Sequence, residues 1–338
     1  MKPINHINIP EKKIGILLVN LGTPDGTDYF SMWRYLREFL SDRRIIELPR
    51  VLWYPILYLF ILVSRPYRSG KLYKKIWNKE KKDSPLRVFS KNIKNKLQKR
   101  FNKKRVLVKF AMNYGNPSID TGLKSLFKSG CVKILVVPLY PQYSATTTAS
   151  VIDRVFQVLK KMRWQPTIRF CPPYFDDNLY INALALHIRK KLKNLKTKPK
   201  KILCSFHGIP RKYFLKGDPY HCHCAKTVRL LNERFRKEKI EFQISFQSRF
   251  GPQEWLRPYM AEKFEETINN NEKNMCIIAP GFAVDCLETL EEIKIQGKED
   301  FLEMGGKEFH YIDCLNDSET SINMIERITR REILGWMK

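Results

Sequence analysis

Six short apolar runs divide the chain, and each has the length and composition of a β-strand. They are IGILLVN at 14–20, VLVKF at 106–110, KILVVP at 133–138, KILCSF at 201–206, FQISF at 242–246 and MCIIAP at 275–280. Most of their residues are apolar, and in the set as a whole apolar and polar residues do not alternate regularly. This is typical of strands buried on both faces of a parallel sheet.

Segments with helical periodicity lie between these runs. They cover residues 119–128, 151–162, 179–195 and 228–237. Strands that alternate with helices along a chain indicate an α/β fold, in which parallel strands are joined by right-handed crossovers.

The two halves of the chain repeat one another. ILLVNLGTP (16–24) pairs with ILCSFHGIP (202–210), VLVKFAMNYGNP (106–117) with FQISFQSRFGPQ (242–253), and VKILVVPLYPQYS (132–144) with NMCIIAPGFAVD (274–285). The first two runs are about 50 residues farther apart in the first half than in the second, which indicates an insertion there. We predict two similar α/β domains at 11–160 and 165–312, with an insertion at about 45–90. We expect a C-terminal helix within 313–338 that packs back on the N-terminal domain.

Ligands of open parallel sheets bind beyond the carboxyl ends of the strands. The loops in that position are 22–25, 140–144, 207–211 and 281–288. If the two domains face each other, these loops line one cleft. His207 lies on a tight turn at the end of its strand, and an unperturbed imidazole pKa of about 6.5 suits a general base or a metal ligand.

A row of carboxylates follows the last apolar run. Glu288 and Glu292 are four residues apart and share one face of the predicted helix. Asp285 either caps that helix or joins the row. Acids at a helix N-terminus are normally a capping feature, but a row that opens into a cleft would also bind a divalent cation or relay protons.

The chain is strongly basic, with 62 Lys and Arg against 34 Asp and Glu and a formal net charge of +28. Such a charge favours contact with nucleic acid or with an anionic membrane. Residues 79–105 include twelve basic and two acidic side chains among apolar residues at helical spacing. Because no nucleic-acid recognition motif accompanies them, we interpret these residues as a solvated helix face and expect no nucleic-acid partner.

One apolar and aromatic stretch, Val51–Val63, stands apart from the strands. It has thirteen residues, whereas about 20 are needed to cross a bilayer. It contains Trp53, Tyr54, Tyr58 and Phe60, and arginines flank it. One proline inside the stretch and another just before it are expected to interrupt a helix. This composition suits a core helix, the interface of an anionic membrane, or the lip of a pocket for a flat apolar ligand.

The eight cysteines are expected to be reduced, since the chain opens without the apolar core of a signal peptide. His221, Cys222, His223 and Cys224 are four consecutive candidate ligands. Adjacent residues cannot all point at one tetrahedral ion, and no second pair has zinc-finger spacing. We therefore favour free side chains over a structural zinc or an iron–sulfur cluster at Cys222 and Cys224.

Seven long motifs, in order between about residues 12 and 315, resemble the ferrochelatase family of the bacterial protoporphyrin type. They are LLVNLGTPD (17–25), YLREFLSD (35–42), VPLYPQYSATTTAS (137–150), SFHGIP (205–210), GDPYHCHC (217–224), FQSRFGPQEWLRPY (246–259) and PGFAVDCLETLEEI (280–293). The resemblance implies two Rossmann-like domains with parallel sheets, the chelatase fold, around an active-site cleft. It also implies a lyase that inserts Fe²⁺ as substrate into protoporphyrin IX, releases two protons and makes protohaem in the terminal step of haem biosynthesis.

The same resemblance assigns residues. His207 matches the active-site histidine, as proton acceptor, metal ligand or both. Glu288 matches the essential acid opposite it, and Glu292 continues the acidic row as a further metal ligand. Gln296 stands where some members have an acid, and Cys286 where others have histidine.

For the porphyrin, the resemblance points to Leu21 and to the loop with Tyr140, Tyr143 and Ser144. Asn113 stands where many members have an arginine, so Asn113 or Arg249 is expected at a propionate. Lys82-Asp83-Ser84-Pro85 replaces a Gly-Gly-Ser-Pro type of segment.

The inserted stretch with Trp53, Tyr54, Tyr58 and Phe60 matches the pocket lip. The resemblance implies a cytoplasmic protein with peripheral contact to the inner membrane, and an upstream porphyrinogen oxidase as a candidate partner.

Three alternatives stay open from the sequence. The first is a coproporphyrin ferrochelatase or another tetrapyrrole chelatase, against which the SFHGIP sequence and the combination of one His with a Glu argue. The second is a haem carrier on the same fold, against which the intact His207 and Glu288 argue. The third is a nucleic-acid-binding protein, which leaves the acidic row without a role.

Overall fold

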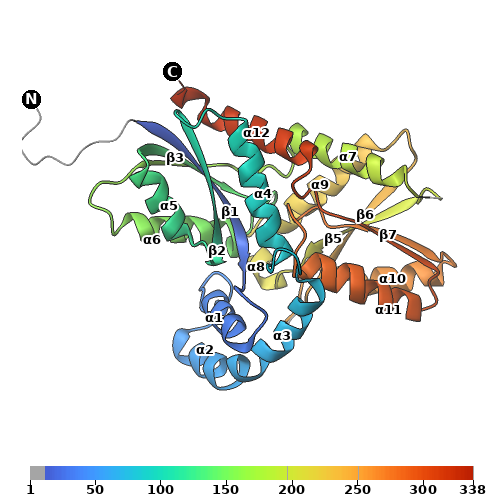
Figure 1. The fold of residues 1–338 in the computed structure, drawn as a ribbon. Coiled ribbons are helices and arrows are strands. Elements are labelled where there is room, and N and C mark those ends of the chain that lie inside the picture. Colours follow the sequence, from blue (N-terminus) through green and yellow to red (C-terminus); the bar gives the residue numbers. More distant parts are fainter. Residues whose placement is uncertain (1–11, 196, 250, 338) are drawn as a thin grey trace, which may run out of the picture.

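The computed structural model describes residues 12–195, 197–249 and 251–337, and its strands form two four-stranded parallel sheets (Figure 1). The first sheet contains β1 (Lys13–Thr23), β2 (Val106–Gly115), β3 (Cys131–Pro138) and β4 (Thr167–Phe170). The second contains β5 (Lys201–His207), β6 (Glu241–Gln247), β7 (Asn274–Ile278) and β8 (Glu308–Ile312). The predicted α/β class with two parallel sheets is confirmed.

Both sheets have the same strand order. It is β2-β1-β3-β4 in the first and β6-β5-β7-β8 in the second, so the three matched pairs of apolar runs occupy equivalent places. The outer strands β4 and β8 were not predicted. Each is an edge strand of four or five residues with mostly half-exposed side chains, and therefore lacks a continuous apolar run.

Helices cover the sheets in the order expected of alternating elements. They are α4 (Pro85–Lys99), α5 (Ile119–Lys128), α6 (Ser150–Leu159), α7 (Asn178–Leu192), α8 (Arg211–Leu215), α9 (Tyr220–Arg234), α10 (Met260–Asn269), α11 (Lys298–Glu303), α12 (Glu319–Ile333) and the 3₁₀ turn η4 (Leu334–Trp336). The helix predicted at 228–237 begins earlier, at Tyr220, because the His221–Cys224 segment is itself helical.

Three additional helices follow β1 and project away from both sheets (Figure 1). They are α1 (Tyr29–Leu40), α2 (Arg50–Ile56) and α3 (Leu62–Ile76), and a short π-helical segment, η1 (Leu57–Ile61), joins the last two. Between β5 and β6 the second half has only α8 and α9. The expected break at Pro55 is wrong, because the chain stays helical through Pro55 and widens into the π segment.

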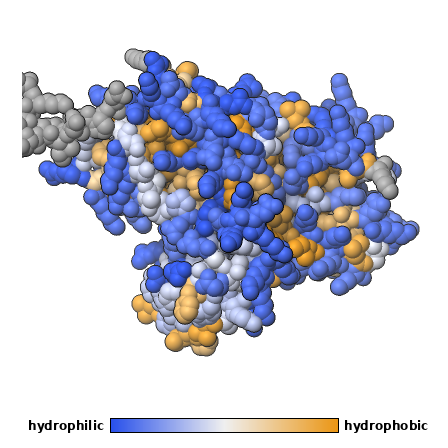
Figure 2. Space-filling view, in the orientation of Figure 1, coloured by the Kyte–Doolittle hydropathy of each residue, from blue (hydrophilic) through white to orange (hydrophobic). Residues whose placement is uncertain are grey.

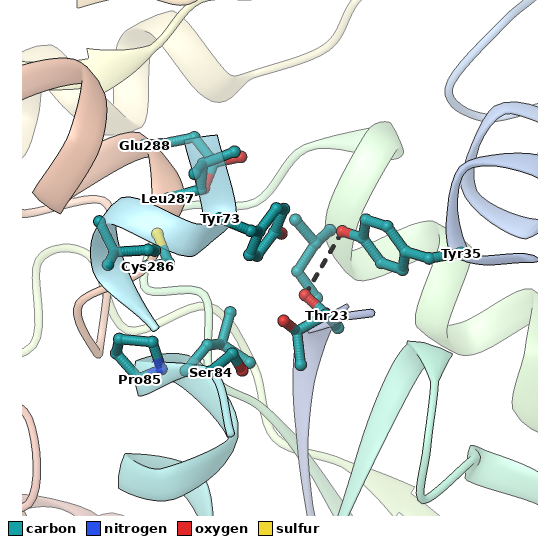
Figure 3. Close-up of a pocket in the computed structure, with 12 residues that line it drawn as sticks. Thr23, Tyr35, Tyr73, Ser84, Pro85, Cys286, Leu287 and Glu288 are labelled. Atoms are coloured by element: carbon teal, nitrogen blue, oxygen red, sulfur yellow. Dashed lines mark hydrogen bonds between the residues drawn. The ribbon is translucent and has the colours of Figure 1, made fainter. Parts of the chain in front are cut away.

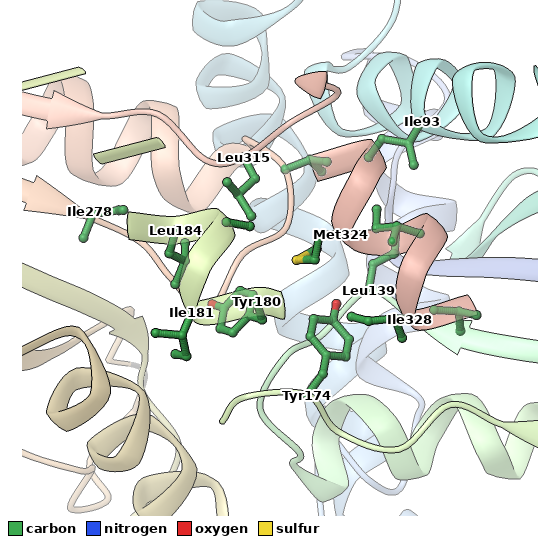
Figure 4. Packing of buried hydrophobic residues seen from close by; sticks show 14 of the residues in the cluster. Ile93, Leu139, Tyr174, Tyr180, Ile181, Leu184, Ile278, Leu315, Met324 and Ile328 are labelled. Atoms are coloured by element: carbon green, nitrogen blue, oxygen red, sulfur yellow. The ribbon is translucent and has the colours of Figure 1, made fainter. Parts of the chain in front are cut away.

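One apolar core joins the two halves (Figure 4). Tyr180 and Leu184 from α7 meet Met324 and Ile328 from α12, and the same cluster reaches strands of both sheets. Helix α12 packs on α4 and β3 of the first half and on α7, which itself packs on α9. The two sheets are therefore held in a fixed relation by buried apolar contacts.

We predict that Ile328→Ala lowers the free energy of unfolding by about 2–5 kcal/mol, because it leaves a cavity in the core that both halves share. Ile328 is 2 % exposed, whereas Leu334, six residues farther along at the start of η4, is 70 % exposed. Urea unfolding followed by circular dichroism measures the loss, and Leu334→Ala serves as the control. Equal stabilities of the two variants would contradict this account of α12.

Candidate active site

His207 is the last residue of β5, a strand that pairs with β6 on one side and β7 on the other. Its Nδ1 lies 2.6 Å from the carbonyl oxygen of Gly208. A carbonyl oxygen can only accept a hydrogen bond, so Nδ1 carries the proton, and in the neutral ring the lone pair is on Nε2. Gly208 allows a close approach here, because a Cβ at that position would lie 3.0 Å from the Gln247 carbonyl oxygen.

The acidic row lies on a π-helix, η3 (Glu288–Gly297), which follows β7. We expected an α-helical face, and the structure instead has the wider π-helical turn, a rare conformation that is frequent at functional sites. Glu292 is fixed by Ser248, whose backbone N–H and hydroxyl donate to its two carboxylate oxygens at 2.7 and 2.5 Å. Ser248 has a φ of +66°, a strained conformation that aims both donors at Glu292.

The charges of His207, Glu288 and Glu292 influence one another. Burial raises the pKa of Glu292 above its ordinary value, and the negative charge of Glu288 raises it further. The hydrogen bond from Ser248 and the nearby His207 act in the opposite direction. The acidic row is therefore electrostatically connected to the imidazole, and Glu292 holds a proton more readily than an exposed glutamate.

Gln247 attaches the start of the π-helix to the sheet. Its Nε2 donates to the Glu288 carbonyl oxygen at 2.7 Å, and its Oε1 accepts from the Ser205 hydroxyl at 2.6 Å. Gln247 also lies beside His207 in the β5–β6 register. One buried amide thus sets the position of Glu288 relative to the strand that carries His207.

Asp285 has a structural role. Its buried carboxylate accepts hydrogen bonds from Thr289, Tyr311 and Asn316 at 2.6–3.0 Å. Of the two alternatives for Asp285, these bonds favour the structural one over membership of the acidic row. Glu291 turns the other way and forms an ion pair with Lys75 of α3 at 2.8 Å, and Gln296 is exposed.

A hollow lies where the carboxyl ends of the two sheets meet the inserted helices (Figure 3). It is lined by residues from β1, α1, α3, the start of α4 and the loop after β7, namely Leu21, Gly22, Thr23, Tyr35, Tyr73, Ile76, Ser84, Pro85, Leu86, Cys286, Leu287 and Glu288. Burial raises the pKa of Tyr35 and of Tyr73, and the charge of Glu288 adds to both shifts. Glu288 therefore borders an aromatic cavity, while His207 is outside its lining.

Leu21 lines this hollow. The predicted porphyrin contacts in the loop after β3 differ from one another in burial and in hydrogen bonding. Tyr140 is largely buried, and its hydroxyl has no hydrogen-bond partner among the described residues. Tyr143 is half-buried. Ser144 is buried and donates to the Asp218 carboxylate at 2.9 Å, so its hydroxyl holds the loop, and its contact with the porphyrin stays a prediction.

The structure places the two expected propionate residues in different surroundings. Asn113 is buried and its Nδ2 donates to the Ser150 hydroxyl at 2.8 Å, while its Oδ1 has no partner within the described chain. Arg249 is exposed, with its guanidinium 5.0 Å from the centre of the Tyr259 ring. The structure does not bring these two residues together.

Of the four expected lip residues, Tyr54, Tyr58 and Phe60 are exposed. Trp53 is the exception. It is 5 % exposed, and its indole N–H donates to the Leu40 carbonyl oxygen at 2.7 Å. This contact anchors α2 to α1, and the lip role of Trp53 stays a prediction.

The His221–Cys224 segment does not converge on one point. His221 stacks on Phe246 and His223 on Phe175, while Cys222 is exposed and Cys224 is buried. Over residues 12–195, 197–249 and 251–337, no three His, Cys, Asp or Glu side chains are grouped so that they could hold a metal ion. That His207, Glu288 and Glu292 bind the entering metal therefore stays a prediction from the resemblance.

Several site residues escaped the analysis of the sequence. Gln247 and Ser248 directly follow the apolar core of β6, so the carboxyl-end rule that singled out His207 would also have found them. Tyr35 and Tyr73 gave no such signal, because they reach the hollow from inserted helices whose packing has no counterpart in the repeat.

We predict that Ser248→Ala raises the pKa of Glu292. The hydroxyl favours the charged carboxylate, so its removal favours the protonated form and moves the titration to higher pH. Isotope-edited infrared titration of the carboxyl band measures the shift, with Ser129→Ala, a distant substitution, as the control. A titration that is unchanged or moves to lower pH would contradict this assignment.

Comparison with known proteins agrees with this arrangement. The family model described as Ferrochelatase matches residues 13–333. The chain is 50 % identical to a ferrochelatase of Agrobacterium fabrum, over 99 % of this chain and 98 % of that protein. It is 52 % identical to a ferrochelatase of Rhizobium meliloti, over 98 % of each.

Solved structures support the fold alone. SirB from Bacillus subtilis with Fe³⁺ superimposes with a TM-score of 0.58 at 12 % identity, and covers 96 % of this chain and 98 % of its own. SirB of Bacillus subtilis subspecies spizizenii in complex with cobalt gives a TM-score of 0.55 at 10 % identity, over 95 % of each chain. With matching motifs, a two-sheet chelatase fold and half of all positions identical to ferrochelatases, the chain belongs to the ferrochelatase family.

Proposed function

We propose that this chain inserts ferrous iron into protoporphyrin IX to form protohaem, with His207 and Glu288 at the reacting centre. The single observation that carries the assignment of roles is the pairing of an imidazole lone pair with an acidic row at the mouth of one sheet. Family membership supports the reaction, and iron enters it as a substrate.

Metallation requires two pyrrole protons to leave the macrocycle as the metal enters. The Nε2 lone pair of His207 suits a proton acceptor, because Nδ1–H is held by the Gly208 carbonyl oxygen. An aromatic wall made of Tyr35 and Tyr73 supplies a rigid surface that favours a bent macrocycle over a flat one. The site would then bind the bent porphyrin, which resembles the transition state, more tightly than the flat one.

The acidic row can carry protons or a metal ion through the wall of the cleft. Glu288 borders the hollow, and Glu292 lies farther along the π-helix beside Ser248. With its raised pKa, Glu292 can accept a proton from the centre and release it outward, or pass a dication inward. Leu21, Tyr140 and Tyr143 are the residues that we assign to porphyrin contact, with the unpaired Asn113 Oδ1 as a polar contact.

We predict that His207→Ala lowers kcat for protoporphyrin metallation about 10²–10⁴-fold, the usual contribution of a general base, and leaves porphyrin affinity nearly unchanged. Glu288→Gln has a similar effect. Anaerobic loss of porphyrin fluorescence with Fe²⁺ measures turnover, and quenching without metal measures binding.

His310→Ala is the matched control, because His310 is half-buried on the edge strand β8 and its imidazole Nε2 lies 3.4 Å from the Glu308 carboxylate, away from the hollow. Full activity of His207→Ala would refute the assignment. A preference for coproporphyrin III would keep the mechanism and change the substrate.

We also propose that the tip formed by α2, η1 and α3 contacts an anionic membrane surface. Figure 2 shows apolar residues gathered at this tip, where Val51 is 85 % exposed and Phe60 is 68 % exposed. Arg68 and Lys71 lie on the adjoining turns of α3 and are exposed. Among the described residues, no helix is long and apolar enough to cross a bilayer, so the tip would lie at the interface.

We predict that Leu59→Glu with Phe60→Glu weakens binding to phosphatidylglycerol vesicles tenfold or more. Each apolar side chain that leaves water for the membrane contributes about 1.5–3 kcal/mol to the free energy of binding, and the variant loses two of them. Vesicle sedimentation measures the partition. The control is Leu334→Glu, which adds one glutamate at an equally exposed position on η4, and Leu59→Glu alone matches it in charge. Equal binding of wild type and the double variant would contradict the proposal.

A further inference from the structure

The loop that carries Tyr140 and Tyr143 leaves the first sheet, but side chains of the second half hold it. The Asp218 carboxylate accepts the Ser144 hydroxyl at 2.9 Å and the Ala145 backbone N–H at 2.8 Å through the same oxygen. Its other oxygen accepts the Tyr220 N–H at the start of α9. Asp218 is 8 % exposed, and hydrogen bonds to a buried charge are among the stronger ones.

A second contact comes from the segment that offered candidate metal ligands. His223 accepts the Tyr143 backbone N–H at its Nδ1, at 3.1 Å. The imidazole ring lies flat on Phe175, with centroids 3.6 Å apart and planes 9° apart. An Nδ1 that accepts a hydrogen bond is unprotonated, and burial lowers the pKa of His223, which keeps the ring neutral.

A third contact completes the attachment. Gln142 donates from Nε2 to the Thr227 hydroxyl at 3.0 Å, and that hydroxyl lies 2.9 Å from the Phe175 carbonyl oxygen. Residues 142–145 are thus each bonded to α9 or to the turn before it. None of these bonds uses a tyrosine hydroxyl, so the attachment of the loop does not depend on the Tyr140 or Tyr143 side chain.

We propose that Asp218 and His223 are positioning residues for the porphyrin. They fix the loop after β3 against α9, and so set how far the pair Tyr140 and Tyr143 lies from the second half of the chain. The GDPYHCHC segment then acts through its hydrogen bonds to this loop and not as a metal site. The inference rests on the proposed function, because it names what holds one wall of the same cleft.

The test compares Asp218→Asn with Asp176→Asn. The first change removes the charge that binds Ser144 and leaves one acceptor oxygen for two backbone donors, so the amide N–H group faces either the Ala145 or the Tyr220 N–H, whereas Asp176 is exposed and lies near the same histidine. We expect Asp218→Asn to raise KM and Kd for protoporphyrin about tenfold with kcat changed less than about threefold, and Asp176→Asn to leave all three unchanged.

Two substitutions of His223 separate its contacts. His223→Phe keeps the ring on Phe175 and removes the acceptor, whereas His223→Asn keeps an acceptor near the Nδ1 position and removes the ring. We expect His223→Phe to weaken porphyrin binding and His223→Asn to restore a large part of it. These milder variants keep the inference testable if Asp218→Asn fails to fold.

Amide hydrogen exchange provides a readout that does not depend on catalysis. Exchange of the Tyr143 and Ala145 amides should accelerate at least tenfold in His223→Phe and Asp218→Asn respectively, with global stability preserved. Unchanged exchange and unchanged KM in both would overturn the inference. Faster exchange in a protein that metallates no porphyrin would refute the proposed function and leave the loop attachment standing.

Discussion

The apolar contact between α7 and α12 is the constraint on which the rest of the structure depends. It joins the two sheets through one apolar core, and it holds the carboxyl ends of their strands so that both face the same hollow. Leu21 from the first sheet and Glu288 from the second can then line the same cavity. Without that fixed relation, neither the aromatic wall nor the acidic row would face a common ligand.

The two halves share one topology but differ in their chemistry. Leu21 and His207 occupy equivalent places in the repeat, at the ends of β1 and β5. The first half supplies an apolar wall there and the inserted helices extend it, whereas the second half supplies an imidazole and a π-helix with two glutamates. This asymmetry suits a flat apolar ligand that must lose protons on one side.

The sequence predicted the elements and residues whose signal is local. The six buried strands are continuous apolar runs; His207 directly follows one of them, and Glu288 lies in the segment after the last. Features that depend on contacts distant in sequence could not be predicted. Trp53 is indistinguishable from Tyr54 until α1 is seen to cover it, and Ser144 shows its partner only when Asp218 is brought beside it. The π-helical turn of η3 was also missed, since two glutamates four residues apart suit an α-helix equally well.

The central claim is that porphyrin binds where the carboxyl ends of both sheets meet. Hydrogen exchange of the wild-type protein, with and without protoporphyrin IX and in the absence of iron, tests it most directly. The account predicts slower exchange at 21–23 and 140–145 of the first half together with 207–208 and 286–292 of the second. Protection confined to one half, or to a surface away from these four segments, would contradict it.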